Sequence, residues 1–374
     1  MKAFKVTQNE AGQRLDKLLA KYLDTAPKSF FYKMLRKKNI TLNGKKAEGN
    51  EKVAEGDEIR LFLSDETIMG FQSEKKRTED RNGQVDSVPC AAGTMPSRQI
   101  PSLKPHEIVY EDAHILIASK PAGELSQKAQ KDDISINERI VEYLRSVHGI
   151  GRDNFTPGVC NRLDRNTTGL IIAGKSLAGL QGMAELLKKR TLHKYYLCIA
   201  AGEAGEQRHL TGYLKKDGST NMVTVYPEEE LLNERADFRE YDRIETELVP
   251  LMVQNGFSLL AIQLITGKTH QIRAHLASIG LPLLGDTKYT GNKKIVDTVT
   301  GKTVSLQEMN HRFHLKYQLL HAYLLQFPEL EGALETLSGK RITVDPAPKF
   351  MRTLEEIFGP VEIKELVERK LEVM

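Results

Sequence analysis

Apolar residues in the first part of the chain follow a helical spacing. Within RLDKLLAKYL (14–23), three leucines and a tyrosine recur at i, i+3, i+4 and i+7, which predicts one buried face of a helix. A second helix is predicted after Pro27, with Ser29 as its N-cap. Next, ITLNGKKA turns at Asn43-Gly44, and VAEGDEIRLFL predicts a closing strand. The pattern therefore predicts a small module of helices and strands.

Residues 105–328 have longer apolar runs and predict one large domain of mixed composition. HILIASK, TGLIIAGK, HKYYLCIAAG and FSLLAIQLITG have the length and the composition of strands. DISINERIVEYLRSV predicts a helix, and so does LAGLQGMAELLKKR, which Ser176 can cap. HQIRAHLASIG predicts a short helix that ends at Gly280, and the stretch with His311, His314 and His321 is expected to be helical.

The chain divides into four parts on this pattern. The small module covers 1–63, and a polar stretch with few large apolar residues, 64–104, predicts a flexible linker. The large domain follows at 105–328, and 329–374 is expected to be an extension that is partly helical. Helices and strands in both folded parts make the predicted fold class α+β.

Composition limits the class of protein. Of 374 residues, 40% are hydrophobic and 28% are charged, which is typical of globular proteins. No apolar run approaches the roughly 20 residues of a membrane span, and the first residues have no apolar core of a signal peptide. Cys90, Cys160 and Cys198 are odd in number and scattered, so no disulfide or zinc framework is expected. We expect a cytoplasmic protein, not bound to membranes, and a monomer.

The positive charge is concentrated at the start of the chain. The whole chain has a net charge of +4, whereas residues 1–62 contain 14 Lys and Arg against 8 Asp and Glu, a local excess of +6. A basic end on a nearly neutral body is typical of a protein that binds a polyanion. The alternative, a well-solvated basic surface, is equally compatible with charge alone.

The first module resembles an S4 domain, a small RNA-binding fold. The resemblance covers about 12–63 and depends on RLDKLL, a basic second helix, ITLNGKKA and EGDEI. It implies an RNA-binding face, and Lys and Arg side chains beside an Asn-Gly turn can donate to phosphates without reading sequence. The residues expected to bind RNA are Arg14, Lys17, Lys33, Arg36, Lys37, Lys38, Asn43 and Lys45.

Four motifs in the large domain resemble the RluA-type family of pseudouridine synthases. They are KPAGE (120–124), NRLDRNTTGL (161–170), RTLHKYYL (190–197) and TGKTHQIRAH (266–275). GLPLLGDTKY (280–289) and YQLLHAYLLQF (317–327) extend the match over nearly all of 105–328. The resemblance implies a catalytic domain on a mixed, largely antiparallel sheet, and an isomerase that converts uridine in RNA to pseudouridine with neither cofactor nor metal.

The resemblance assigns the central role to Asp164. The uracil base is detached from C1′, turned, and reattached through C5, and a carboxylate can assist as nucleophile or general base. By the same resemblance, Arg273 clamps this carboxylate in two-point geometry, Arg162 lies near the extruded nucleotide, and Tyr196 stacks on the base. Arg162 and Asp164 are alternate residues, so an extended segment places them on one side.

Several alternatives are weaker. Without the motif set, Asp164 between Arg162 and Arg165 would be read as a surface ion pair. Lys120 suggests an amine nucleophile, although a role in the Lys-Pro-Ala-Gly turn fits better. The histidines lack carboxylates or cysteines at ligand spacing, so no metal site is expected.

Two positions depart from the family pattern. Asn161 replaces the usual His and cannot titrate, so we assign it no acid–base role. Thr168 replaces a Ser and keeps the hydroxyl.

The sequence therefore predicts an RNA pseudouridine synthase that acts on large-subunit ribosomal RNA. Two alternatives stay open. One is a ribosome-assembly factor that binds RNA through a vestigial synthase domain, for which Asn161 is the sequence support. The other is the same chemistry on transfer RNA.

Overall fold

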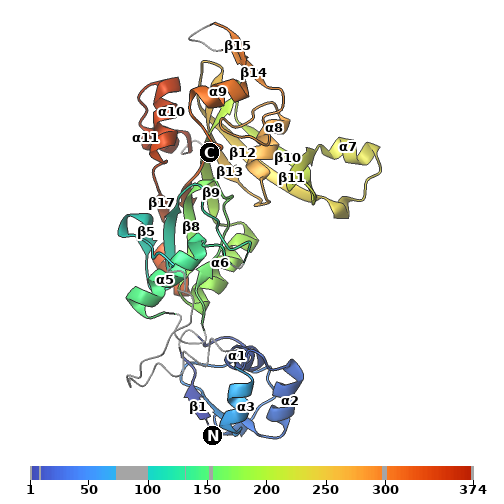
Figure 1. The fold of residues 1–374 in the computed structure, drawn as a ribbon, viewed down its shortest axis with the longest axis vertical. Helices are drawn as coiled ribbons and strands as arrows, with labels where there is room; N and C mark the ends of the chain where they lie inside the picture. The colour runs from blue at the N-terminus through green and yellow to red at the C-terminus, as the bar shows by residue number, and fades with distance from the viewer. Residues whose placement is uncertain are drawn as a thin grey trace, which may run out of the picture. The chain divides into compact units, whose positions relative to one another are not determined.

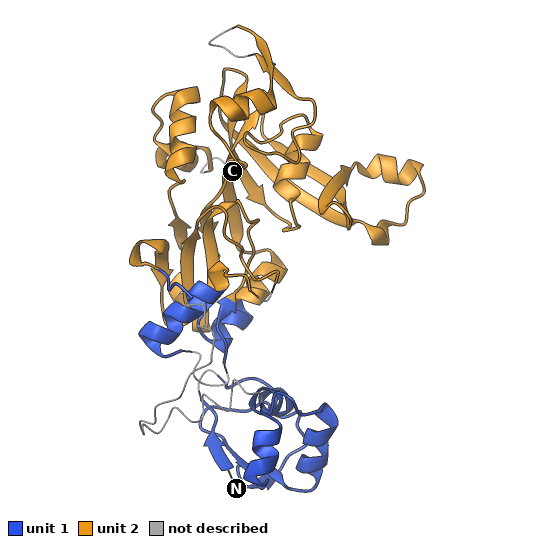
Figure 2. Cartoon of the chain, in the orientation of Figure 1, with its two compact units in different colours: residues 1–103, 138–158, 174–182 blue, residues 104–137, 159–173, 183–374 orange. Residues whose placement is uncertain are grey.

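The structure is a computed structural model that describes residues 2–7, 10–72, 100–130, 132–150, 155–296 and 301–371. The chain divides into two compact units (Figure 2). The first comprises 1–103 with 138–158 and 174–182, and the second comprises 104–137, 159–173 and 183–374. No helix among the described residues is long and apolar enough to cross a membrane.

The amino-terminal part of the first unit folds as the sequence pattern predicts. Its four-stranded sheet has the order β1-β4-β2-β3. The strands are β1 (Lys2–Lys5), β2 (Ile40–Leu42), β3 (Lys45–Lys46) and β4 (Glu58–Leu61), and the helices are α1 (Leu15–Tyr22), α2 (Lys28–Arg36) and α3 (Asp65–Gly70). Leu15, Leu18 and Leu19 are fully buried, as the helical spacing requires. Asn43 and Gly44 have positive φ values of 51° and 72° and turn the chain between β2 and β3.

Two details of this module differ from the sequence prediction. Helix α2 begins at Lys28 after Pro27, so Ser29 lies inside the first turn and is not the cap. Helix α3 falls inside the predicted linker, where Ser64 caps it and Ile68 is buried in the core of the module. The folded module therefore continues through Gln72, and the predicted linker keeps only its later part, of which 73–99 lie outside the described residues.

An 11-stranded sheet forms the centre of the large domain (Figure 1). Its main order is β11-β10-β12-β13-β9-β16-β8-β6-β5, with β17 beside β16 and β7 beside β8. Strand β16 is parallel to β8, whereas β9, β10, β12 and β13 pair with antiparallel neighbours. The predicted mixed, largely antiparallel sheet is confirmed.

The elements of this domain have the following bounds. The sheet strands are β5 (Ile108–Glu111), β6 (Ile115–Lys120), β7 (Gly158–Val159), β8 (Thr168–Gly174), β9 (His193–Ala201), β10 (Arg208–Asp217), β11 (Met222–Tyr226), β12 (Asp242–Gln254), β13 (Phe257–Leu264), β16 (Leu320–Gln326) and β17 (Arg341–Thr343), and a separate hairpin consists of β14 (Lys294–Val296) and β15 (Thr303–Ser305). The helices are α5 (Ile136–His148), α6 (Leu177–Lys189), α7 (Glu228–Asn233), α8 (Gln271–Ser278), α9 (Leu306–Arg312), α10 (Pro348–Phe358) and α11 (Ile363–Leu371), with 3₁₀ turns at η1 (Pro105–Glu107), η2 (Phe238–Glu240) and η3 (Gly332–Leu337).

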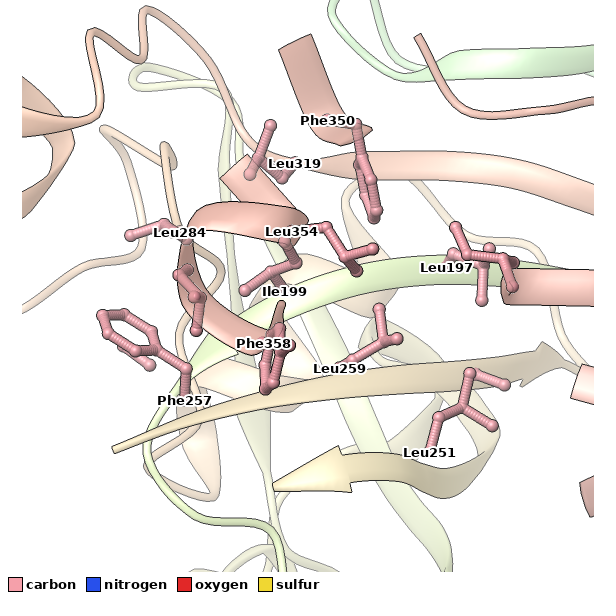
Figure 3. Close-up of a cluster of buried hydrophobic side chains, with 14 of the residues drawn as sticks. Leu197, Ile199, Leu251, Phe257, Leu259, Leu284, Leu319, Phe350, Leu354 and Phe358 are labelled. Atoms are coloured by element: carbon pink, nitrogen blue, oxygen red, sulfur yellow. The ribbon is translucent and has the colours of Figure 1, made fainter. Parts of the chain in front are cut away.

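The carboxyl-terminal tail is part of the main core. Figure 3 shows Leu354 and Phe358 of α10 beside Ile199 of β9 and Leu259 of β13. Further along, α11 adds buried apolar residues to the same cluster, and β17 pairs with β16. The boundary predicted at 328/329 therefore does not separate two bodies, because the tail covers apolar surface of the sheet that would otherwise contact water.

The histidine-rich stretch differs from the prediction. Only His311 lies in a helix, α9, whereas His314 follows that helix with a positive φ of 51° and His321 lies in strand β16. Strand β16 replaces the expected helix because LLHAYLLQ is apolar on both faces and is buried between β9 and β8.

Candidate active site

Asp164 lies in a tight turn that leads into strand β8. The Thr167 backbone N–H donates to the Asp164 carbonyl at 3.1 Å, which closes the turn. Ser126 fixes the residue before the aspartate, because its hydroxyl donates to the Leu163 carbonyl at 2.8 Å and accepts from the Leu163 N–H at 2.9 Å. The carboxylate is therefore held by the backbone on both sides.

Lys120 anchors the same turn from beneath. Its fully buried ammonium donates to the carbonyls of Pro121 (2.9 Å), Glu124 (2.7 Å) and Arg165 (2.9 Å). Burial lowers the pKa of Lys120 to about 8, although the charges of Glu124 and Asp164 act in the opposite direction. These three bonds fit the turn-forming role expected for Lys120, because its ammonium joins three backbone carbonyls of the turn.

Arg273 reaches Asp164 but clamps a different carboxylate. Its Nη1 donates to Asp164 Oδ2 at 3.2 Å, whereas Nε and Nη2 form the two-point pair with Asp286, at 2.7 Å and 3.0 Å. The expectation that Arg273 grips Asp164 in two-point geometry is thus wrong, because the fork of the guanidinium is occupied by the fully buried Asp286. Burial lowers the pKa of Arg273, but the bonds and charges of Asp286 and Asp164 together outweigh burial and raise it.

Tyr196 faces the aspartate and Tyr195 faces the other side of strand β9. Tyr195 packs in the cluster with Leu197 and Ile199, and Tyr196 packs in the cluster with Leu163 and Leu320. Neighbouring residues of a strand face opposite sides of the sheet, which separates the two rings. Burial, followed by the charge of Asp164, raises the pKa of the Tyr196 phenol above its ordinary value, so the group stays neutral.

Two further rings, those of His270 and Tyr289, lie near the carboxylate. His270 adopts a left-handed conformation (φ 55°) at the N-cap of α8, and its Nε2 lies 3.9 Å from Asp164 Oδ2. Its Nδ1 is 2.9 Å from the Tyr289 hydroxyl, which accepts from the Val223 N–H at 3.0 Å. Burial lowers the pKa of His270, so the neutral ring can accept at Nδ1 and present Nε2–H toward the aspartate.

The two departures from the family pattern have structural explanations. Oδ1 of Asn161 accepts the Ile172 N–H at 2.8 Å, so this side chain ties the turn to β8 without titrating. The Thr168 hydroxyl is 2.8 Å from Nδ1 of His321, and Nε2 of His321 donates to the Val344 carbonyl at 2.9 Å. Asn161 and Thr168 therefore hold the scaffold around Asp164.

A basic cleft of about 900 Å³ opens onto the aspartate. Its lining includes Asp164 and Tyr196, with Leu264 and Thr266 from the end of β13 and the loop after it. Asp164 is the one acidic side chain in the lining, against six cationic ones: Lys128, Arg162, Arg190, Lys194, Lys216 and Lys268. Such a surface favours a polyanion. Arg162 and Asp164 line it together, as alternation predicted, whereas Arg165 turns away and donates to the Gly123 carbonyl at 3.0 Å.

The residues expected to bind RNA in the first module divide into two groups. Lys17, Lys33, Arg36, Lys37, Lys38 and Lys45 are exposed. Arg14 instead makes a two-point pair with Asp16, at 3.1 Å and 3.0 Å, and Asn43 donates to Asp57 (2.8 Å) and accepts from the Glu58 N–H (2.8 Å). These two side chains are used by the fold of the module. A hollow of about 620 Å³ is lined by Tyr32, Lys33, Arg36 and Lys46, among others.

Sequence reasoning missed Asp286, His270 and Tyr289. All three lie in stretches that resemble the family, GLPLLGDTKY and TGKTHQIRAH. The roles of Asp286 and Tyr289 depend on the loop after α8, which brings Asp286 to Arg273, 13 residues earlier in the chain. A polar Asp between Gly and Thr in an otherwise apolar stretch was the available signal.

Comparisons with known proteins identify the class. Residues 114–278 match the family model described as RNA pseudouridylate synthase. In fold, the chain is similar to human RNA pseudouridylate synthase domain containing 4, with a TM-score of 0.51, 20% identity, and coverage of 68% of this chain and 94% of the other. Residues 114–278 therefore match the RNA pseudouridine synthases, a family of isomerases, as the sequence motifs predicted.

Curated relatives match over most of their length. An uncharacterized RNA pseudouridine synthase of Mycoplasma genitalium is 28% identical over 332 residues, covering 88% of this chain and 90% of the relative. Ribosomal large subunit pseudouridine synthase C of Vibrio cholerae is 28% identical over 333 residues, with coverage of 88% and 90%. The enzyme of that name from Escherichia coli is 27% identical over 332 residues, with coverage of 87% and 88%.

Proposed function

We propose that this enzyme converts specific uridines of large-subunit ribosomal RNA to pseudouridine, with Asp164 as the catalytic carboxylate. The observation that carries the proposal is the placement of Asp164, bonded to Arg273 and directed into a cleft lined by six cations and Tyr196. The names of the curated relatives support the ribosomal target. Chemistry on ribosomal RNA agrees with a cytoplasmic protein, and one chain contains every group named here, which agrees with a monomer.

The isomerisation conserves atoms and needs one well-placed anion. The C1′–N1 bond of uridine breaks, a C1′–C5 bond forms, and a proton leaves C5 while N1 gains one. Asp164 either attacks C1′ or removes the 2′ proton to give a glycal, and both roles require the carboxylate to be ionised. Arg273 donates to Oδ2 and leaves Oδ1 for the substrate. Neither route requires electrons or a cofactor.

The cleft must also pull the target nucleotide out of its stack. Unstacking costs a few kcal/mol, which stacking on Tyr196 and contacts to phosphates can offset. Arg162 is exposed and lines the cleft, and the family resemblance places it near the extruded nucleotide. The first module resembles an S4 domain, and its exposed lysines supply sequence-independent affinity that holds the enzyme on structured RNA.

Two other functions remain as outcomes of the test. A vestigial binding factor would require a damaged site, yet Asp164, Arg273 and Tyr196 are assembled and Asn161 has a structural bond. A transfer RNA target would use the same chemistry and differ only in the RNA modified.

The test uses purified full-length enzyme on transcripts of large-subunit ribosomal RNA and of transfer RNA. Pseudouridine mapping should find product at defined positions in the ribosomal transcript with wild type and none with Asp164→Asn. Product in transfer RNA alone would replace the proposed target. Binding of both transcripts without product, by wild type as well as the variant, would establish the binding factor instead.

A further inference from the structure

Lys194 is a half-buried cation that lacks an anionic partner. It lies in β9 and lines the basic cleft. No hydrogen bond or ion pair joins its ammonium to another residue in the part of the chain that the structure describes, although nearby exposed cations, Lys268 and Arg243, have carboxylate partners. Burial, and then the charge of Arg190, lowers the pKa of Lys194. A cation that burial disfavours gains most from an anion that enters from outside.

Arg190 is the second cation at this place and is only loosely held. It lines the same cleft, has a positive φ of 60°, and its side chain is 52% exposed. Its Nη1 is 3.9 Å from Oε1 of Glu245, and Arg243 lies closer to the same oxygen. Its guanidinium can therefore turn toward an anion at low cost, because an exposed pair of this length contributes little.

Gly267 leaves room beside the ammonium. It lies in the exposed loop between β13 and α8, and a Cβ added there would meet one neighbour, Nζ of Lys194, at 3.7 Å. Its φ is not in the left-handed region, so the backbone does not require glycine at this point. The missing side chain keeps the ammonium open to the cleft.

The position relative to Tyr196 suggests what binds there. Lys194 and Tyr196 are alternate residues of β9, so both face the cleft, and their Cα atoms are about 7 Å apart along the strand. A base stacked on Tyr196 belongs to a nucleotide whose backbone can reach the ammonium. Two cations without a close anion, at the edge of a base-stacking ring, match a phosphodiester.

We propose that Lys194 and Arg190 form a phosphate-binding subsite for the RNA strand next to the flipped uridine. The proposal rests on the proposed function, since it assigns a contact in the same cleft. The alternative is that Lys194 serves packing alone, with its aliphatic stem as the useful part. The two differ in one measurable quantity, the salt dependence of RNA binding, because only a phosphate contact releases counterions.

The experiment measures binding of a fluorescent 12-residue oligouridine to the full-length Asp164→Asn enzyme, with and without Lys194→Met. Methionine keeps the stem and removes the charge. For single strands each phosphate contact contributes about 0.7 to the slope of log affinity against log salt. We expect Lys194→Met to make this slope shallower by about 0.7. Raising the salt from about 50 to about 200 mM should then weaken RNA binding roughly 2.6-fold less in the variant than in the enzyme that keeps Lys194.

Two further variants keep the result interpretable. Lys364→Met removes one exposed lysine of α11, outside the cleft, and should leave the slope unchanged. Arg190→Met removes the second cation of the proposed subsite and should make the slope shallower, as Lys194→Met does. An unchanged slope for Lys194→Met, or an equal change for Lys364→Met, overturns the subsite. If Lys194→Met does not fold, an unchanged slope for Arg190→Met overturns the subsite. Wild type that binds but makes no pseudouridine contradicts the proposed function instead.

Discussion

Replacing Asp286 with Asn should disable the enzyme, although Asp286 is outside the cleft lining. The carboxylate accepts from Nε and Nη2 of Arg273 at 2.7 Å and 3.0 Å, and from the backbone N–H groups of Lys288 and Tyr289 at 2.8 Å and 3.2 Å. Asn can supply one of the two oxygens, and its NH₂ group then faces a guanidinium donor. The remaining bond from Arg273 to Asp164 would lose its support.

The structure sets the expected size of the effect. Asp286 is 0% exposed and the Arg273 side chain is 7% exposed. The substitution therefore leaves the buried guanidinium with one acceptor oxygen in place of a charged carboxylate. Breaking a buried pair by removing one partner costs about 3–5 kcal/mol, and we expect about 3 kcal/mol because Asp164 still shares the charge. Asp164 would shift with Arg273, and a displacement of about 1 Å can cost about 100-fold in rate.

The assay combines urea unfolding with single-turnover formation of pseudouridine. Asp237→Asn is the matched control, because Asp237 also holds an arginine, Arg239, by two points, but on the surface (side chains 47% and 90% exposed). That variant should unfold close to the wild-type urea concentration and keep its rate, because an exposed ion pair contributes little to stability. RNA affinity should be normal in both. The reasoning is refuted if Asp286→Asn unfolds at the wild-type urea concentration and turns over at the wild-type rate.

Three further predictions concern the scaffold around Asp164. Gly169→Ala should destabilise the fold by about 4 kcal/mol in urea unfolding, because at φ 105° a Cβ would lie 2.2 Å from the Ala322 carbonyl oxygen. Gly280→Ala is the control: its φ is 80° but the space around it is open, so it should cost about 1 kcal/mol. Burial lowers the pKa of His321 from 6.5 to about 4, so between these pH values the unfolded chain binds more protons than the folded one. The free energy of unfolding should therefore fall by about 3 kcal/mol as the pH falls through this range. His321→Gln should flatten the profile of urea stability against pH, and an unchanged profile would contradict the assignment. Lys120→Met should leave three carbonyls without their donor, which costs about 1–3 kcal/mol of folding stability for each. The variant should lower turnover more than RNA affinity. Equal effects on both would argue against a role of Lys120 in positioning.

The sequence predicted the parts that depend on local pattern and on ordered motifs. Helical spacing located the buried leucines of α1, and alternation correctly placed Arg162 and Asp164 on one side of their segment. Asp164 and Arg273 meet at 3.2 Å although 109 residues separate them, because both belong to motifs of the family.

What the sequence did not predict depends on contacts made by the folded chain. Asp286 acts through a buried ion pair that no periodicity indicates. His321 lies in strand β16, which is paired on both sides, with β9 and with β8. The sequence predicts the tail as an extension because it does not show which surface its amphipathic helices cover, whereas in the structure Leu354 and Phe358 complete the core.

The central claim, that Asp164 modifies ribosomal RNA, is tested most directly by pseudouridine mapping of total RNA from cells that lack this protein. The cells are restored either with wild type or with Asp164→Asn expressed at the same level. We predict that defined positions in large-subunit ribosomal RNA lose pseudouridine and regain it only with wild type. Restoration of those positions by Asp164→Asn would contradict the account.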